Sequence, residues 1–138
     1  MILVDTSGLL AFYDDLESLH GETVRVLQDP QPRILSPFVL AELDYLVLNN
    51  VGRRVELEVL DDIGGGAYEL APFVAADVAD AVDVVRRYSD FDVGLTDASI
   101  VVLSRRYGVN DVLTLDERHF RVLSGARDRP FRVLPADV

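Results

Sequence analysis

Four acidic residues of this chain are placed where they could bind a divalent metal ion. Each stands at the end of an apolar run or beside one: Asp5, Glu42, Asp97 and Asp116. A carboxylate set among apolar residues is costly unless a cation neutralises it, and converging carboxylates suit hard divalent cations. The four acids therefore favour metal-dependent hydrolysis, because a bound ion can activate water and neutralise developing negative charge.

Two of these acids follow runs that predict short buried strands. Asp5 closes the apolar residues 1–4, and Asp116 follows the strand-like residues 112–115. The crevice beyond the carboxyl ends of parallel strands is where ligands bind in α/β proteins. Helix capping is the alternative explanation for both residues, since aspartate is a preferred N-cap.

Glu42 lies in a segment that predicts a helix over residues 37–49. Ser36 suits the N-cap of this helix, and Pro37 suits its first position. The neighbours of Glu42 three and four positions away are all apolar or aromatic: Phe38, Val39, Tyr45 and Leu46. We therefore expect Glu42 to face the core and Asp44 to be solvated. A core-facing carboxylate needs a metal, a proton or an arginine, so a structural ion pair is the competing explanation.

Asp97 opens a predicted helix over residues 97–107, which ends at Gly108. Ile100 and Val101, three and four positions later, place Asp97 on the inward face of this helix. The helix dipole favours an acid in the first turn without any function, which is the simpler explanation for Asp97 alone. Capping and dipole effects would have to coincide four times to explain all four acids, so their joint pattern indicates a site.

The elements that must position these acids alternate along the chain. Strands are expected at residues 1–5, 33–35, 67–71, 112–115 and 131–134. Helical patterns cover residues 8–13, 16–28, 37–49, 53–63, 76–88 and 97–107. This order predicts an α/β fold with a parallel sheet covered by helices on both faces. At 138 residues and 49% hydrophobic composition, the chain is expected to form a single domain over residues 1–138.

Four short segments contain these acids, and together they extend over the whole chain: residues 4–7, 37–43, 94–99 and 113–116. They resemble the successive acidic motifs of PIN-domain ribonucleases, and in particular those of VapC-type toxins of bacterial toxin–antitoxin pairs. All four acidic positions of the family pattern carry the expected residue type. The resemblance implies a PIN-like three-layer α/β domain with a central parallel sheet flanked by helices.

The resemblance also implies a function and a site. It implies a Mg²⁺ or Mn²⁺ centre built by all four acids, with Thr6 or Ser7 offering a nearby hydroxyl. The implied activity is endoribonucleolytic cleavage of structured RNA, either transfer or ribosomal RNA, which arrests growth. The implied partners are a cognate VapB-type antitoxin and a second copy of the chain in a homodimer.

Charge is unevenly distributed along the sequence. The net charge is −11, but residues 105–132 hold seven arginines against four acids. Arg118 and its neighbours are candidates for contacts with phosphates, although the absence of lysine is explained as well by GC-rich coding. Asp92 could reach a second metal ion. His119 and His20 are lone imidazoles that are expected to pack or to lie at the surface, with His119 close enough to Asp116 to touch a phosphate.

Several classes of protein are excluded or retained by composition. The chain has no cysteine, no apolar stretch of membrane-spanning length and no opening signal peptide, so a cytoplasmic protein without membrane contact is expected. The absence of lysine argues against receiver domains, haloacid-dehalogenase-like phosphatases and P-loop nucleotidases, which need one. The remaining alternative is a noncatalytic acidic α/β protein-interaction module that uses the apolar residues 37–63.

Overall fold

The computed structural model describes all of residues 1–138, and its secondary structure follows the expected alternation of strands and helices. The strands are β1 (Ile2–Val4), β2 (Arg33–Leu35), β3 (Glu69–Leu70), β4 (Asp111–Leu113) and β5 (Arg132–Leu134). The α-helices are α1 (Thr6–Tyr13), α2 (His20–Gln28), α3 (Pro37–Asn50), α4 (Arg53–Gly64), α5 (Ala75–Arg87), α6 (Leu95–Tyr107) and α7 (Glu117–Phe120). Two short 3-10 helices are η1 (Ser89–Phe91) and η2 (Ala126–Asp128).

All five strands form one parallel sheet in the order β3-β2-β1-β4-β5. The chain adds β2 and β3 on one side of β1 and then returns to add β4 and β5 on the other. The strand order therefore reverses between β1 and β4. In α/β sheets a crevice opens at such a reversal, outside the carboxyl ends of the strands, and ligands bind there.

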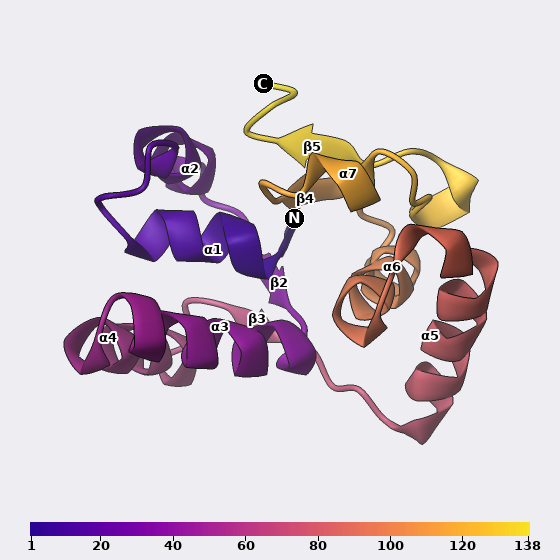
Figure 1. Ribbon diagram of the computed structural model, residues 1–138, viewed down its shortest axis with the longest axis horizontal. Coiled ribbons are helices and arrows are strands. Elements are labelled where there is room, and N and C mark those ends of the chain that lie inside the picture. The colour runs from indigo at the N-terminus through magenta and orange to yellow at the C-terminus, as the bar shows by residue number, and fades with distance from the viewer.

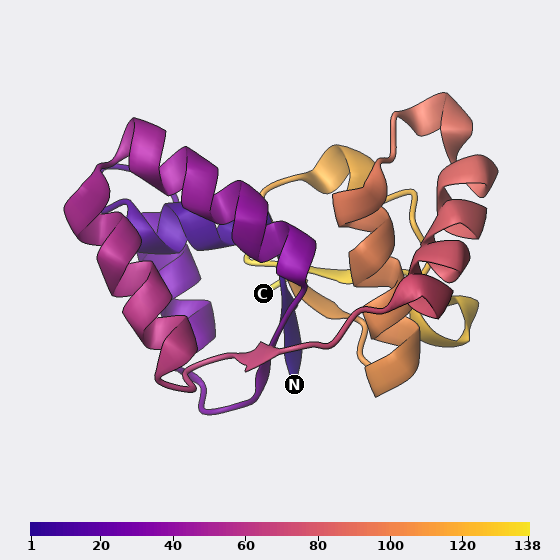
Figure 2. The ribbon, with the colours of Figure 1, turned by 90° about the horizontal axis from the view of Figure 1, so that it is seen from below.

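Helices cover both faces of this sheet. Figures 1 and 2 show α1 to α4 on one side of the strands and α5 and α6 on the other. The core is a cluster of 29 buried residues that includes the whole of β1. The sheet is covered on both faces, so β1, β2, β4 and β5 each bury two or three apolar residues, and they were readable as short apolar runs. The edge strand β3 is exposed instead. The expected three-layer α/β fold with a central parallel sheet is confirmed.

Some boundaries differ from the sequence expectation, each for a local reason. The second helix begins at His20 rather than at residue 16, because the Asp14 side chain accepts a hydrogen bond from the Leu16 amide and forms a turn there. The short helix α7 was not expected, since four residues carry too little periodicity to be recognised. None of the helices combines the length and the apolar character that crossing a membrane requires.

Candidate metal centre

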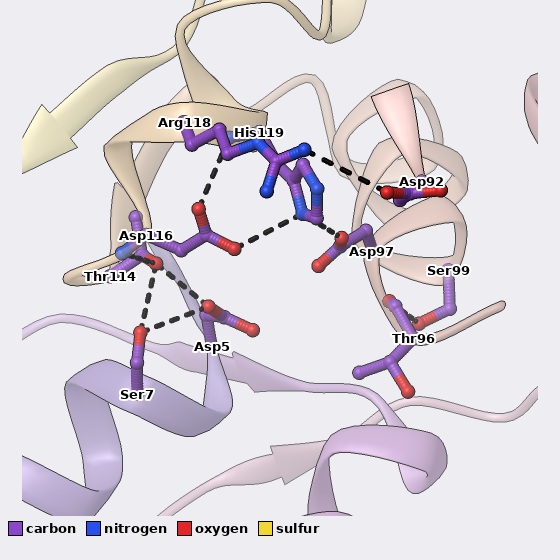
Figure 3. A network of polar contacts seen from close by, with 10 residues as sticks. All are labelled: Asp5, Ser7, Asp92, Thr96, Asp97, Ser99, Thr114, Asp116, Arg118 and His119. Atoms are coloured by element: carbon purple, nitrogen blue, oxygen red, sulfur yellow. Dashed lines mark hydrogen bonds and ion pairs between the residues drawn. The ribbon is translucent and has the colours of Figure 1, made fainter. Parts of the chain in front are cut away.

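The carboxyl ends of β1 and β4 bring two of the predicted acids to the point where the strand order reverses. Asp5 directly follows β1, and Asp116 lies three residues after β4. The first turn of α6 approaches from the opposite sheet face and carries Asp97. Figure 3 shows the side chains of Asp5, Asp97 and Asp116 gathered in one place.

Asp5 occupies the N-cap position of α1, but its side chain does not cap the helix. Its Oδ2 instead accepts a hydrogen bond from the Thr114 hydroxyl at 2.7 Å and one from the Ser7 hydroxyl at 3.2 Å. The residue is buried, at 5% exposure. The capping explanation therefore does not account for Asp5, whose carboxylate is held by the hydroxyls of Thr114 and Ser7.

Burial raises the pKa of Asp5 to about 6. The hydrogen bond from Thr114 opposes this rise, and the negative charge of Asp97 adds to it. A carboxylate that is removed from water beside another carboxylate is destabilised until a cation arrives. The position of Asp5 is thus the electrostatic environment that a metal ion would relieve.

Thr114 and Ser7 connect the two strand ends. The Thr114 hydroxyl accepts a hydrogen bond from the Asp116 amide at 2.9 Å, and Ser7 Oγ accepts one from the Leu115 amide at 2.9 Å. Gly8 lets α1 approach β4, since a Cβ there would lie 2.5 Å from the Leu113 carbonyl oxygen. This close approach fixes Asp5 relative to Asp116 through backbone and hydroxyl groups.

Thr6 is buried at 3% exposure, and its hydroxyl has no hydrogen-bond partner. A buried hydroxyl without a partner is unusual in a folded protein. Two hydroxyls were expected near the acids. The Ser7 hydroxyl donates a hydrogen bond to Asp5, whereas the hydroxyl of Thr6, the residue next to Asp5 in the sequence, makes no hydrogen bond.

Asp97 and Asp116 face each other across His119. Asp116 is the N-cap of α7, because its Oδ1 accepts a hydrogen bond from the His119 amide at 3.1 Å. Its second oxygen, Oδ2, lies 3.1 Å from the imidazole Nδ1 of His119, and Asp97 Oδ2 lies 2.7 Å from the same nitrogen. Capping therefore explains one oxygen of Asp116 and leaves the other directed at the His119 imidazole, which also contacts Asp97 (Figure 3).

Burial also raises the pKa of Asp97, whose side chain is only 16% exposed. The nearby imidazole of His119 opposes this rise, and the negative charges of Asp116 and Glu42 add to it. The helix dipole is therefore not the only electrostatic influence on the Asp97 carboxylate, because three other ionisable groups act on it.

Glu42 does not face the core, which corrects the sequence expectation. It is exposed, and α3 buries Val39, Leu43 and Val47 instead. Apolar residues lie on nearly every side of α3, so their spacing could not select the inward face. Asp44 is also not fully solvated, since its Oδ1 is buried without a hydrogen-bond partner.

Glu42 nevertheless lines the same cavity as Asp97 and Asp116, whereas the buried Asp5 is not among the residues that line it. This cavity is open to solvent and has a volume of about 320 Å³. Its lining residues are Glu42, Gly94, Leu95, Thr96, Asp97, Asp116 and His119. No arginine lines it, and Glu42 takes part in no ion pair of the structure. The competing explanation of a structural ion pair for Glu42 is therefore not realised.

A chain of hydroxyl groups holds the first turn of α6 against the start of α3. The Phe38 amide donates to Ser36 Oγ, Ser36 Oγ lies 2.7 Å from Ser99 Oγ, and Ser99 donates to the Thr96 carbonyl at 2.6 Å. Both serines are buried. Since Ser99 uses its proton on Thr96, the proton between the two hydroxyls belongs to Ser36. The sequence suggested Ser36 only as a cap, yet it also ties the helix of Glu42 to that of Asp97.

Asp92 and Arg118 lie at the edge of the site rather than within it. Asp92 adopts a left-handed backbone with φ of 56°, and its carboxylate lies 3.7 Å from the Arg118 guanidinium. Both side chains are exposed, at 87% and 75%. The structure does not bring Asp92 to the other acids. Arg118 is loosely held beside the cavity (Figure 3).

The residues present fit a divalent cation. Oxygen and nitrogen atoms of Asp97, Asp116 and His119 all lie within 4.8 Å of one another, which suits the shell of one ion. The carboxylates of Asp5 and Glu42 add negative charge around them. Raised pKa values, the absence of arginine from the cavity and unpartnered buried polar atoms are all consistent with a site that a cation completes.

Comparisons with known proteins identify the family to which the chain belongs. The PIN domain family matches residues 2–125 of the chain. Ribonuclease VapC26 of Mycobacterium tuberculosis is 42% identical over 135 residues, which cover 97% of this chain and 100% of that protein.

Solved structures show the same fold. The crystal structure of Mycobacterium tuberculosis VapC20, a sarcin-ricin loop cleaving toxin, aligns with a TM-score of 0.78 at 21% identity and covers 84% of this chain and 90% of that one. FitAcB from Neisseria gonorrhoeae aligns with a TM-score of 0.64 at 19% identity and covers 87% of this chain and 91% of that one. With its acids at the strand reversal and its extended identity to VapC26, this chain belongs to the PIN-domain family and is of the VapC type.

Proposed function

We propose that this chain is the toxin component of a VapBC-type toxin–antitoxin pair and acts as a metal-dependent endoribonuclease. The observation that carries the proposal is the convergence of acids from separate parts of the chain on one open cavity without an arginine. The 42% sequence identity to Ribonuclease VapC26, which extends over 97% of this chain, supports the same activity.

The chemistry follows from the charges of the site. Mg²⁺ or Mn²⁺ held by Asp5, Glu42, Asp97 and Asp116 would neutralise charge on the scissile phosphate and activate a water molecule. The contribution of the chain is to hold its carboxylates before the ion arrives. Thr114 and Ser7 orient Asp5 by hydrogen bonds, and the N-cap bond to the His119 amide orients Asp116. Such preorganisation lowers the cost of forming the charged site.

The proposed substrate is structured RNA, in the class of transfer or ribosomal RNA. VapC20, which shares the fold, cleaves the sarcin-ricin loop. The open cavity admits a phosphodiester backbone, and Arg118 extends from its edge with a largely exposed guanidinium. Arginine suits bidentate contacts with phosphate, so we assign Arg118 to RNA binding. The reaction is proposed to take place in the cytoplasm.

The proposed partners are a VapB-type antitoxin and a second copy of the chain. Helices α3 and α4 leave Tyr45, Leu57 and Leu60 exposed, which provides apolar surface for a protein partner. Residues 1–104 hold nineteen acids against six arginines, a charge that suits a basic segment of an antitoxin.

Induced expression followed by sequencing of RNA 5′ ends tests this function. The wild-type chain should produce new 5′ ends at a few positions in one transfer or ribosomal RNA, and growth should stop. The matched variant Asp97→Asn should produce none of them while accumulating to the same level. Growth arrest without new RNA ends, or the same ends in the variant, would contradict the proposal.

A further inference from the structure

His119 is held firmly beside the carboxylates by the residue that follows it. Phe120 is completely buried and packs edge-to-face on Phe131, with ring centroids 5.4 Å apart. This contact anchors the single turn of α7 and restricts the backbone of His119. The imidazole is 16% exposed and lines the cavity together with Glu42 and Asp97.

The two ring nitrogens of His119 are buried, and neither makes an aligned hydrogen bond. Nδ1 lies 2.7 Å from Asp97 Oδ2 and 3.1 Å from Asp116 Oδ2, but these short contacts lack hydrogen-bond alignment. A neutral imidazole offers one donor and one acceptor, and burying either without a partner is costly. A purely structural histidine would not be expected to leave both nitrogens in this state.

We propose that His119 is a ligand of the metal centre and that its nitrogen gives the site a preference for Mn²⁺ over Mg²⁺. This inference rests on the proposed function, because it adds a ligand to the same site. Its Nδ1 and the facing oxygens of Asp97 and Asp116 form the group of atoms within 4.8 Å of one another. Oxygen ligands alone suit both ions, whereas imidazole suits transition-metal ions and adds little for Mg²⁺.

A simpler role for His119 would be that of a positive counter-charge between two carboxylates. In that role the imidazole would compete with the ion, and its removal would strengthen the binding of both metals. As a ligand, its removal weakens Mn²⁺ binding selectively. The two roles therefore predict opposite changes in Mn²⁺ affinity.

Calorimetric titration of the purified chain with Mn²⁺ and with Mg²⁺ separates these outcomes. His119→Gln should lower Mn²⁺ affinity by about tenfold or more, as is typical when a metal site loses an important interaction. Mg²⁺ affinity should change by less than about threefold, because the carboxylates that suit this ion remain. The matched control is His20→Gln, since His20 is the other histidine and its Nδ1 lies 2.9 Å from the Ala11 carbonyl oxygen.

Pulsed electron paramagnetic resonance of bound Mn²⁺ gives a readout that is independent of activity, and its wild-type spectrum does not depend on how well any variant folds. The wild type and His20→Gln should show nitrogen coupling from a bound imidazole, and His119→Gln should lack it. Three results would each overturn the proposed ligand role of His119 without affecting the proposed metal-dependent function. They are unchanged Mn²⁺ affinity in His119→Gln, tighter binding of both ions in that variant, and a wild-type spectrum without nitrogen coupling. A wild-type chain that binds neither ion in a saturable way would overturn the proposed metal-dependent function as well.

Discussion

The hydroxyl of Thr114 donates a 2.7 Å hydrogen bond to the buried carboxylate of Asp5. It thereby joins the ends of β1 and β4, the two strands between which the strand order reverses. The same oxygen accepts from the Asp116 amide, so one side chain fixes two of the acids. The site is thus built into the sheet before any ion is bound.

Replacing Thr114 by valine should destabilise the protein and weaken metal binding. The variant removes the closer of the two hydroxyl donors to the Asp5 carboxylate and the acceptor of the Asp116 amide, which costs about 1–3 kcal/mol. Loss of this bond also raises the pKa of Asp5 further, since Thr114 lowers it. Urea denaturation and metal titration measure the two effects. Thr114→Ser, which keeps the hydroxyl, should restore most of both, and a valine variant as stable as wild type would refute this role.

The raised pKa of Asp5 predicts a specific pH dependence of stability in the metal-free protein. Folding raises the pKa of this group from 3.8 to about 6, so the folded state binds the proton more tightly than the unfolded state. The resulting stabilisation is fully present below about pH 4 and is lost as pH rises through about 6. Asp5→Asn should therefore be more stable than wild type at pH 7.5, by about 2 kcal/mol.

Denaturation in the presence of a chelator at pH 4 and at pH 7.5 checks this sign. The advantage of Asp5→Asn should largely disappear at the lower pH, because the wild-type carboxyl group is then protonated in the folded state and about half protonated in the unfolded state. A stability difference that is the same at both values would show that the substitution acts through packing.

Asp97→Asn should remove the stabilisation that divalent ions give. An ion that binds only the folded state raises the melting temperature, by an amount that grows with the ratio of the ion concentration to its dissociation constant. The variant should show no rise at millimolar Mn²⁺ or Mg²⁺, while its metal-free form stays at least as stable as wild type, because Asp97 faces other acids. Asp80→Asn is a suitable control, since Asp80 is an exposed acid on α5. An undiminished response in Asp97→Asn would indicate binding elsewhere.

Substitutions of Arg118 and Arg121 should have different effects, the first on RNA binding and the second on stability. Arg121 makes 2.7 Å contacts with both oxygens of Asp137 and also pairs with Glu117, so its guanidinium is already engaged. Arg118 has only one exposed partner at 3.7 Å. Arg118→Ala should weaken RNA binding and make the dependence of the binding constant on salt concentration shallower, by the amount that corresponds to about one lost phosphate contact. Arg121→Ala should instead lower the melting temperature. Equal salt dependence in Arg118→Ala and wild type would remove Arg118 from the RNA interface.

The element order could be predicted because buried parallel strands are short apolar runs that stand apart from helical patterns. Asp5 and Asp116 were located by their positions after such runs. The face of α3 could not be predicted, since that helix is apolar around most of its circumference. Glu42 was therefore selected for the wrong reason, although it lines the cavity.

Thr114 was not singled out by the sequence, and His119 was expected only to pack, to lie at the surface or to touch a phosphate, because their contacts with the acids depend on which strands and helices meet. Thr114 acts on Asp5 from a distance of 109 residues along the chain. A weaker local signal existed for His119, which lies three residues after Asp116 and thus on the same side of one helical turn. That spacing has meaning only once the residues are known to be helical.

Cleavage of RNA by the purified protein tests whether the acidic residues form a metal-dependent catalytic site. Wild-type chain, Asp5→Asn and Asp116→Asn should be compared on the same RNA, with Mn²⁺, with Mg²⁺ and with chelator, after their folding has been checked. We expect discrete cleavage by wild type that requires the ion. The rate should fall by at least about a hundredfold in both variants, because Asp5 and Asp116 each help to hold the ion that would neutralise the transition state. A noncatalytic interaction module would show no cleavage under any condition, and full activity of Asp5→Asn or of wild type in chelator would contradict the metal-dependent mechanism.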